Sequence, residues 1–71
     1  MIHMHQMGEY IKASRQEKDM TQSTLAEKLG VTAQAVSKWE RGQSFPDLSR
    51  LDDLAEILEV SVAYLLTGAD N

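Results

Sequence analysis

The chain has 71 residues, no cysteine and a formal net charge of −4. Its length suits one small domain, and without cysteine neither a disulfide nor a thiolate metal cluster can stabilise it, so the core must come from packed side chains. No apolar run approaches the roughly 20 residues of a membrane span, and the start MIHMHQM lacks the basic flank and apolar stretch of a signal peptide. We therefore expect a cytoplasmic protein with no membrane partner.

Charge is distributed unevenly along the chain. All seven basic residues lie within residues 1–50, beside six acidic ones, whereas the last 21 residues carry five acidic residues and no basic one. Basic groups can therefore gather on one side of the first part of the domain while the end stays acidic. The negative net charge alone does not exclude a nucleic-acid partner.

The first predicted elements are a tail and two helices. We expect residues 1–6 to form a flexible N-terminal tail. The spacing i, i+3, i+4, i+7 then predicts a helix to about Lys18. The residues at this spacing are Met7, Tyr10, Ile11 and Ser14. A second helix is predicted over about residues 21–29, with Thr21 as its N-terminal cap.

A third helix with two unlike faces is predicted over about residues 32–41. Gly30 permits a left-handed turn before it, and Thr32 can cap its N-terminus. Its apolar face holds Val36 and Trp39, which we assign to the core. The residues of its polar face are Gln34, Ser37, Lys38 and Arg41. These side chains can hydrogen-bond base edges and phosphates, and they also suit a solvated surface.

Two more helices are predicted after the loop GQSFP. Asp47 is the expected cap of the fourth and Ser61 that of the fifth, which ends at Gly68. In the fourth helix, the residues expected to face inward are Leu48, Leu51, Leu54, Ala55 and Leu58, and those expected to face outward are Asp52, Asp53, Glu56 and Glu59. Residues 69–71 are expected to be a C-terminal tail or the start of a linker.

Residues 21–42, TQSTLAEKLGVTAQAVSKWERG, have the pattern of a helix-turn-helix, two short helices joined by about three residues around a glycine. Ala26 is small where the two helices approach each other. The residues expected to pack the pair on the rest of the domain are Leu25, Val31 and Val36. An ordinary helical hairpin has the same spacing, so the pattern alone leaves both interpretations open.

The sequence resembles the Cro/C1-type helix-turn-helix family of phage repressors and bacterial regulators, also called the xenobiotic-response-element family. The resemblance runs from about Gly8 to Gly68, through TQSTLAEKLGV, QAVSKWERG and LAEILEVSVAYLLTG. It implies an all-α fold, a compact five-helix lambda-repressor-like domain over residues 7–68 with a central helix-turn-helix. The third helix of such a domain enters the major groove of DNA.

The resemblance also implies which residues touch DNA. The expected base contacts are Ala33, Gln34, Ser37 and Lys38, and the expected phosphate contacts are Gln22, Arg41, Gln43 and Ser44. The chemistry agrees, because a Gln amide can pair with adenine, a Lys ammonium can donate to guanine and an Ala methyl can touch the thymine methyl. At Gln22, the start of a helix adds backbone N–H donors for a phosphate.

Four further positions concern architecture. Arg15 and Glu40 match a pair that commonly forms a structural salt bridge in the family. Ser14 stands where the family usually has a larger apolar residue, which predicts looser packing of the first helix. Asp19 replaces a common glycine, and an Asp tolerates the left-handed conformation at some cost.

No feature of the sequence indicates an enzyme. It has no glycine-rich phosphate loop, no metal-spaced cluster and no Ser or Cys nucleophile paired with a His in the predicted domain. His3 and His5 lie in the predicted tail without a carboxylate or thiol partner, so we predict no metal site. We expect no cofactor, and no small-molecule ligand is evident because a pocket is hard to house in so small a core.

We therefore expect a sequence-specific DNA-binding protein, a transcriptional regulator of the repressor type that binds a two-fold operator as a homodimer within the nucleoid. The acidic fourth helix is expected to lower the affinity of one domain for the DNA phosphates, which favours the binding of two domains to one duplex. The candidate dimer surface comprises Val60, Val62, Leu65 and Leu66, which could equally close the monomer core. Two alternatives stay open: a protein-interaction module of antitoxin or adaptor type, and the N-terminal DNA-binding module of a longer regulator.

Overall fold

The computed structural model describes residues 3–69, and this part of the chain contains five helices and no strand. The helices are α1 (Met4–Glu17), α2 (Gln22–Leu29), α3 (Ala33–Glu40), α4 (Leu48–Leu58) and α5 (Val62–Thr67). The all-α, five-helix prediction is therefore confirmed. None of the described helices is both long and apolar enough to span a membrane.

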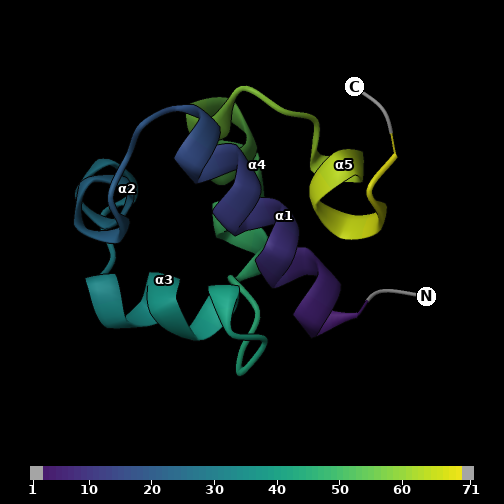
Figure 1. Cartoon of the computed structure of the whole chain (residues 1–71), viewed down its shortest axis with the longest axis horizontal. Coiled ribbons are helices and arrows are strands. Elements are labelled where there is room, and N and C mark those ends of the chain that lie inside the picture. The colour runs from purple at the N-terminus through teal and green to yellow at the C-terminus, as the bar shows by residue number, and fades with distance from the viewer. Residues whose placement is uncertain (1–2, 70–71) are drawn as a thin grey trace.

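The helix α1 lies at the centre of the arrangement. It packs against α3, α4 and α5, while α2 packs against α3 and α4. In Figure 1, α1 crosses the middle of the molecule, α3 lies along the bottom, α2 on the left and α5 on the right. The α4–α5 connection lies at the top, at the opposite end of the molecule from α3.

The start of α1 differs from the prediction. The helix begins at Met4, three residues early, so residues 4–6 belong to α1 and not to a tail. A tertiary contact explains the difference, because Gly42 of the loop after α3 approaches the first turn so closely that an added Cβ would lie 2.9 Å from the His5 Cα. The predictions for residues 1–2 and 70–71 lie outside the described residues.

Three of the predicted helix caps form side-chain hydrogen bonds. The hydroxyls of Thr21, Thr32 and Ser61 accept from backbone N–H groups three residues on, at 3.0, 3.1 and 2.9 Å. Asp47 occupies the cap position of α4 but makes no such side-chain bond, so only its position was predicted correctly. Gly68 ends α5 in the left-handed conformation, with φ 77°, as expected.

The core lies between α1 and the other four helices. Its residues are Met7, Ile11, Leu25, Ala26, Leu29, Val36, Trp39, Leu51, Leu54, Ala55, Leu58 and Leu65. Trp39 is thus a core residue, as predicted. The inward assignment of Leu48 is wrong, because its side chain is 85% exposed. Leu48 is the first residue of α4, and a helical side chain leans toward the N-terminus of its helix, which here carries it past the core.

Candidate nucleic-acid interface

The turn between α2 and α3 begins at a left-handed glycine, Gly30, with φ 77°. The Gly30 and Val31 N–H groups both donate to the Ala26 carbonyl, at 2.9 and 3.0 Å, and the Gly30 N–H also lies 3.4 Å from the Glu27 carbonyl oxygen. A side chain at Gly30 would be strained in this left-handed conformation. The tight turn starts α3 within three residues of the end of α2, which is the helix-turn-helix that the sequence predicts.

The outer face of α3 carries the predicted base-contacting residues. Gln34 and Lys38 are exposed, while Ala33 and Ser37 are half-buried beside them. The opposite face holds Val36, which is fully buried. The structure therefore brings all four predicted base-contacting residues onto one short helix whose other face packs into the core.

A buried polar network connects α3 to α1 and α2. The Arg15 guanidinium donates from Nε and Nη2 to the two carboxylate oxygens of Glu40, at 2.6 and 3.0 Å. Arg15 also donates to the Met20 carbonyl at 2.7 Å, and the Gln22 amide donates to Glu40 at 3.0 Å. Arg15 and Glu40 are both only 8% exposed, so this is the structural ion pair that was predicted.

The helices α1 and α3 touch through backbone at Gly8. A Cβ added at Gly8 would lie 2.3 Å from the Trp39 carbonyl oxygen and 2.8 Å from that of Glu40. Only a residue without a side chain permits this approach. Gly8 was not predicted to have a role, although a glycine inside a helical pattern is the signal that could have pointed to a close contact.

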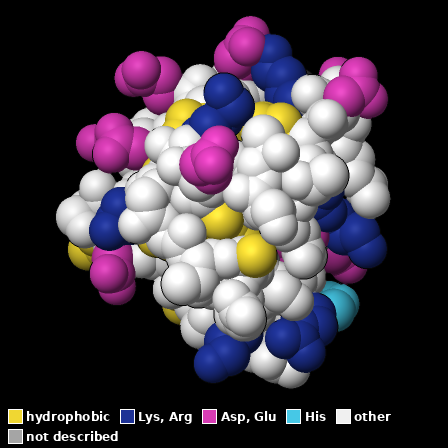
Figure 2. Space-filling view, turned by 90° about the vertical axis from the view of Figure 1, so that its left-hand side faces the viewer, with side chains coloured by type: hydrophobic (Ala, Val, Ile, Leu, Met, Phe, Trp, Pro, Cys, Tyr) yellow, Lys and Arg dark blue, Asp and Glu magenta, His cyan; other side chains and the backbone are white. Residues whose placement is uncertain are grey.

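Burial of Glu40 decides the charge of the α3 face. Because Arg15 pairs with Glu40, the exposed charges on α3 and the residue after it are Lys38 and Arg41, both positive. Figure 2 shows Lys and Arg side chains at the lower end of the molecule, where α3 lies, and most acidic side chains in the upper half or at the left edge. The α3 end is thus the part suited to a polyanion.

The predicted phosphate-contacting residues lie around this face. Arg41 and Gln43 are exposed just after α3, and Ser44 is half-buried in the following loop. The Gln43 N–H donates to the Lys38 carbonyl at 2.8 Å, which keeps the loop close to the helix. Gln22 lies at the first position of α2, but one N–H of its side chain is used by Glu40.

The structure separates the residues of the predicted dimer surface. Leu65 is 0% exposed and belongs to the monomer core, which for this residue is the second of the two predicted alternatives. The helix α5 is short and buries its apolar side against α1 and α4. Val60, Val62 and Leu66 are half-buried.

The exposed apolar groups lie elsewhere. The side chains of Phe45, Leu48 and Leu66 surround a hollow of about 280 Å³; we call these three residues the Phe45 patch. Phe45 is 44% and Leu48 85% exposed, which is unusual for large apolar side chains.

Comparison with known proteins agrees with this geometry. The helix-turn-helix family model matches residues 11–65. An uncharacterized HTH-type transcriptional regulator of Bacillus subtilis, YqaE, is 41% identical over 64 residues, which cover 90% of this chain and 55% of the relative. The chain thus spans about half the length of that relative.

Two solved structures illustrate how the fold is used. The P22 c2 repressor in complex with a synthetic operator superposes with a TM-score of 0.85 at 38% identity, covering 89% of this chain and 96% of that chain. FeII HppE in complex with substrate superposes with a TM-score of 0.81 at 31% identity, but there the match covers 94% of this chain and only 39% of that chain. The same five-helix unit therefore also occurs as part of a longer chain.

Proposed function

Because this chain belongs to the Cro/C1-type helix-turn-helix family, whose model covers residues 11–65, we propose that it binds double-stranded DNA sequence-specifically and represses transcription. The observation that carries the proposal is the match over 89% of the chain to a repressor in complex with its operator. The polar face of α3 supports it, because this face combines an amide and a hydroxyl with two positive charges that have no ion-pair partner among the described residues, Lys38 and Arg41. Bound to chromosomal DNA, the protein would be part of the nucleoid.

Base reading is assigned to the outer face of α3. Gln34 can pair with the N6 and N7 positions of adenine, and Lys38 can donate to O6 and N7 of guanine. Ala33 and Ser37 are half-buried beside these two residues. Ala33 would contact the methyl group of a thymine, and Ser37 would hydrogen-bond a base edge.

Phosphate binding is assigned to the two sides of α3. At the N-terminus of α2, the first backbone N–H groups have no partner within the helix, and Gln22 keeps one amide N–H that Glu40 does not use; these donors would bind one phosphate. Arg41, Gln43 and Ser44 would contact the backbone beyond the other end of α3. The Arg15–Glu40 pair would fix the position of α3 between these two sets of phosphate contacts without touching DNA.

We assign dimerisation to the Phe45 patch, which keeps Leu66 of the predicted surface, in place of the buried Leu65. Val60 and Val62 are left out because they lie in or directly after the α4–α5 connection, at the end of the molecule opposite α3. The patch adjoins the loop that follows α3, so a two-fold axis through it would bring two copies together beside their reading helices. Paired recognition helices must lie about 34 Å apart to read half-sites one helical turn apart. Three apolar side chains fall short of the ~800 Å² per partner of a stable interface, so dimers are expected to form on the operator.

The proposal is tested by selecting binding sites from random duplex DNA at about 100 mM salt with the wild type, Gln34→Ala and Lys38→Ala. We expect a palindromic motif that relaxes at one or two positions per half-site in each variant. The matched controls are Gln16→Ala and Lys12→Ala, which make the same changes at exposed positions of α1. If folded protein enriches no motif, or the controls relax the motif equally, the proposal is wrong.

A second candidate function is a protein-interaction module, either alone or within a longer regulator. It is favoured by the net charge of −4 and by the use of this fold as 39% of the HppE chain. The dependence of affinity on salt separates the two functions. Several phosphate contacts produce a steep fall in affinity as salt rises, whereas a protein interface need not.

A further inference from the structure

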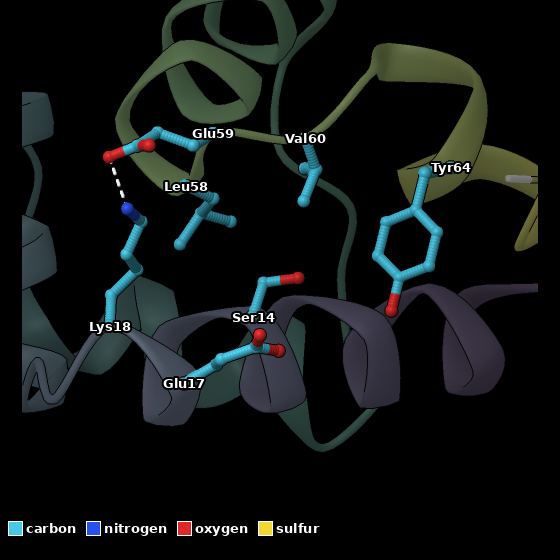
Figure 3. A pocket seen from close by; sticks show the side chains of 7 residues that line it. All are labelled: Ser14, Glu17, Lys18, Leu58, Glu59, Val60 and Tyr64. Carbon is cyan, nitrogen blue, oxygen red and sulfur yellow. Dashed lines mark hydrogen bonds and ion pairs between the residues drawn. The ribbon is translucent and has the colours of Figure 1, made fainter. Parts of the chain in front are cut away.

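A hollow of about 440 Å³ lies between the end of α1 and the α4–α5 connection. Its lining residues are Ser14, Glu17, Lys18, Leu58, Glu59, Val60 and Tyr64 (Figure 3). This volume lies within the range of about 300–1,000 Å³ typical of small-molecule sites. Such a pocket was not predicted from the sequence. The hollow lies beside Ser14, where a larger apolar side chain would fill the gap.

The Ser14 hydroxyl is directed into this hollow. Ser14 is only 6% exposed, yet its side chain makes no hydrogen bond to any other described residue. In Figure 3 the hydroxyl points from α1 into the space bordered by Leu58 and Val60. None of the fully buried side-chain N and O atoms in the described part of the chain lacks a hydrogen-bond partner, so the Ser14 oxygen still reaches solvent through the hollow. A polar group of a ligand can replace that water as its hydrogen-bond partner.

The walls of the hollow are fixed by contacts with neighbouring residues. The Tyr64 ring packs on Tyr10, with ring centroids 5.3 Å apart and an angle of 42° between the rings. At the other end, the Lys18 ammonium pairs with the Glu59 carboxylate and connects α1 to the α4–α5 connection (Figure 3). The site therefore has an aromatic wall, an apolar floor of Leu58 and Val60, and a charged rim.

The charge of the rim determines which ligands fit. Two carboxylates, Glu17 and Glu59, and one ammonium, Lys18, leave a net charge of −1. Lys18 neutralises Glu59, while Glu17 has no ion-pair partner among the described residues. An anionic ligand would face both carboxylates, whereas a cation could pair with Glu17 and lie against the Tyr64 ring.

From this arrangement we propose that the hollow is a binding site for a small organic cation, a protonated amine with an apolar body. The ammonium pairs with Glu17 and hydrogen-bonds the Ser14 hydroxyl, and the apolar body covers Leu58 and Val60. The site lies near the top of Figure 1, at the opposite end of the molecule from α3, so a bound amine leaves the α3 face uncovered. The proposal does not depend on DNA binding.

The test is a titration of the ¹⁵N-labelled protein followed by NMR, with three probes of nearly equal shape: 2-phenylethylamine, 2-phenylethanol and phenylacetate. We expect saturable shifts of backbone amides at the lining residues with the amine. The alcohol should bind about three- to fivefold more weakly, which is what one exposed ion pair supplies, and the carboxylate should not saturate. Equal binding of all three probes, or shifts centred outside the hollow, would overturn the proposal.

Three variants sharpen the test. Ser14→Leu fills the hollow and should weaken amine binding at least about tenfold, and Ser14→Ala should weaken it about threefold by removing one hydrogen bond. Glu17→Gln should abolish the preference for the amine over the alcohol. The matched control Glu27→Gln removes the same charge on α2, outside the lining, and should bind the amine like the wild type. If Glu17→Gln keeps the preference, or Glu27→Gln loses it, the assigned cation site is wrong.

Discussion

The two sides of α1 are built differently. Toward α3, the contact consists of backbone against backbone at Gly8 and a buried bidentate ion pair between Arg15 and Glu40. Toward the α4–α5 connection, it consists of a hollow at Ser14 and the exposed ion pair of Lys18 and Glu59. The difference teaches that the buried ion pair lies on the side of α1 that positions the proposed reading helix, whereas the side toward the α4–α5 connection keeps open space and an exposed ion pair.

The strongest test of this comparison removes the buried pair. Arg15→Met leaves the Glu40 carboxylate buried without its cation, which should lower the free energy of unfolding by about 3–5 kcal/mol. Lys18→Met, on the other side of α1, should cost only about 0–1 kcal/mol, because Glu59 stays hydrated. Urea denaturation followed by circular dichroism measures both. If both variants lose the same free energy of unfolding, the ion pairs on the two sides of α1 contribute equally and the comparison is wrong.

The close approach at Gly8 is tested next. In an open helix, replacing Gly with Ala stabilises by about 1 kcal/mol, but here the added Cβ meets two carbonyl oxygens of α3, so Gly8→Ala should destabilise by about 1–3 kcal/mol. Because α3 would be displaced, affinity for the selected DNA should fall as well. Ala13→Gly, at an exposed position of α1, is the control; it should cost about 1 kcal/mol through helix propensity and leave DNA affinity unchanged. A stabilising effect of Gly8→Ala would contradict the contact.

On the side of α1 toward the α4–α5 connection, filling space should stabilise the protein. Ser14→Leu places an apolar side chain in the hollow beside Leu58 and Val60 and should raise the free energy of unfolding by about 1 kcal/mol. The same change at the exposed Ser23 of α2 should alter stability by no more than about 0.5 kcal/mol. Thermal and urea unfolding of both variants provide the measurement. A loss of stability in Ser14→Leu would mean that the hollow cannot accept the side chain.

The smallest expected effect concerns the turn after α1. Asp19 has φ 56°, the left-handed region that favours glycine, so Asp19→Gly should stabilise the protein by about 0.5–1 kcal/mol. The control Asp53→Gly, inside α4, should destabilise by about 1 kcal/mol because glycine weakens a helix interior. If both variants lose stability, the left-handed conformation of Asp19 does not lower the stability of the protein.

Local features were predicted well from the sequence. The helix caps Thr21, Thr32 and Ser61 and the left-handed Gly30 follow from hydrogen bonds and backbone sterics that act within a few residues. Trp39 was assigned to the core from its spacing to Val36 alone, and the structure agrees. Spacing also identified the polar face of α3, whereas its base-contacting residues were implied by the family resemblance, and their contacts with DNA stay a prediction.

The errors concern surfaces that depend on distant parts of the chain. Leu48 continues the apolar spacing of its helix, but its position at the first turn leaves it exposed. For Leu65, a dimer surface and the monomer core both stayed open, because the sequence cannot show that α1 and α4 already cover it. The early start of α1 depends on Gly42, 37 residues after the His5 that it contacts.

By itself, the sequence determined the number and order of the helices, their caps, the helix-turn-helix and the polar face of α3, because periodicity and capping are local. Only the tertiary structure decided which of these faces stay exposed. It buried Glu40 against Arg15 and so left α3 with a positive face, and it left the space at Ser14 open. The physical reason is that burial and charge pairing depend on residues that are far apart in the chain and meet only when the helices pack.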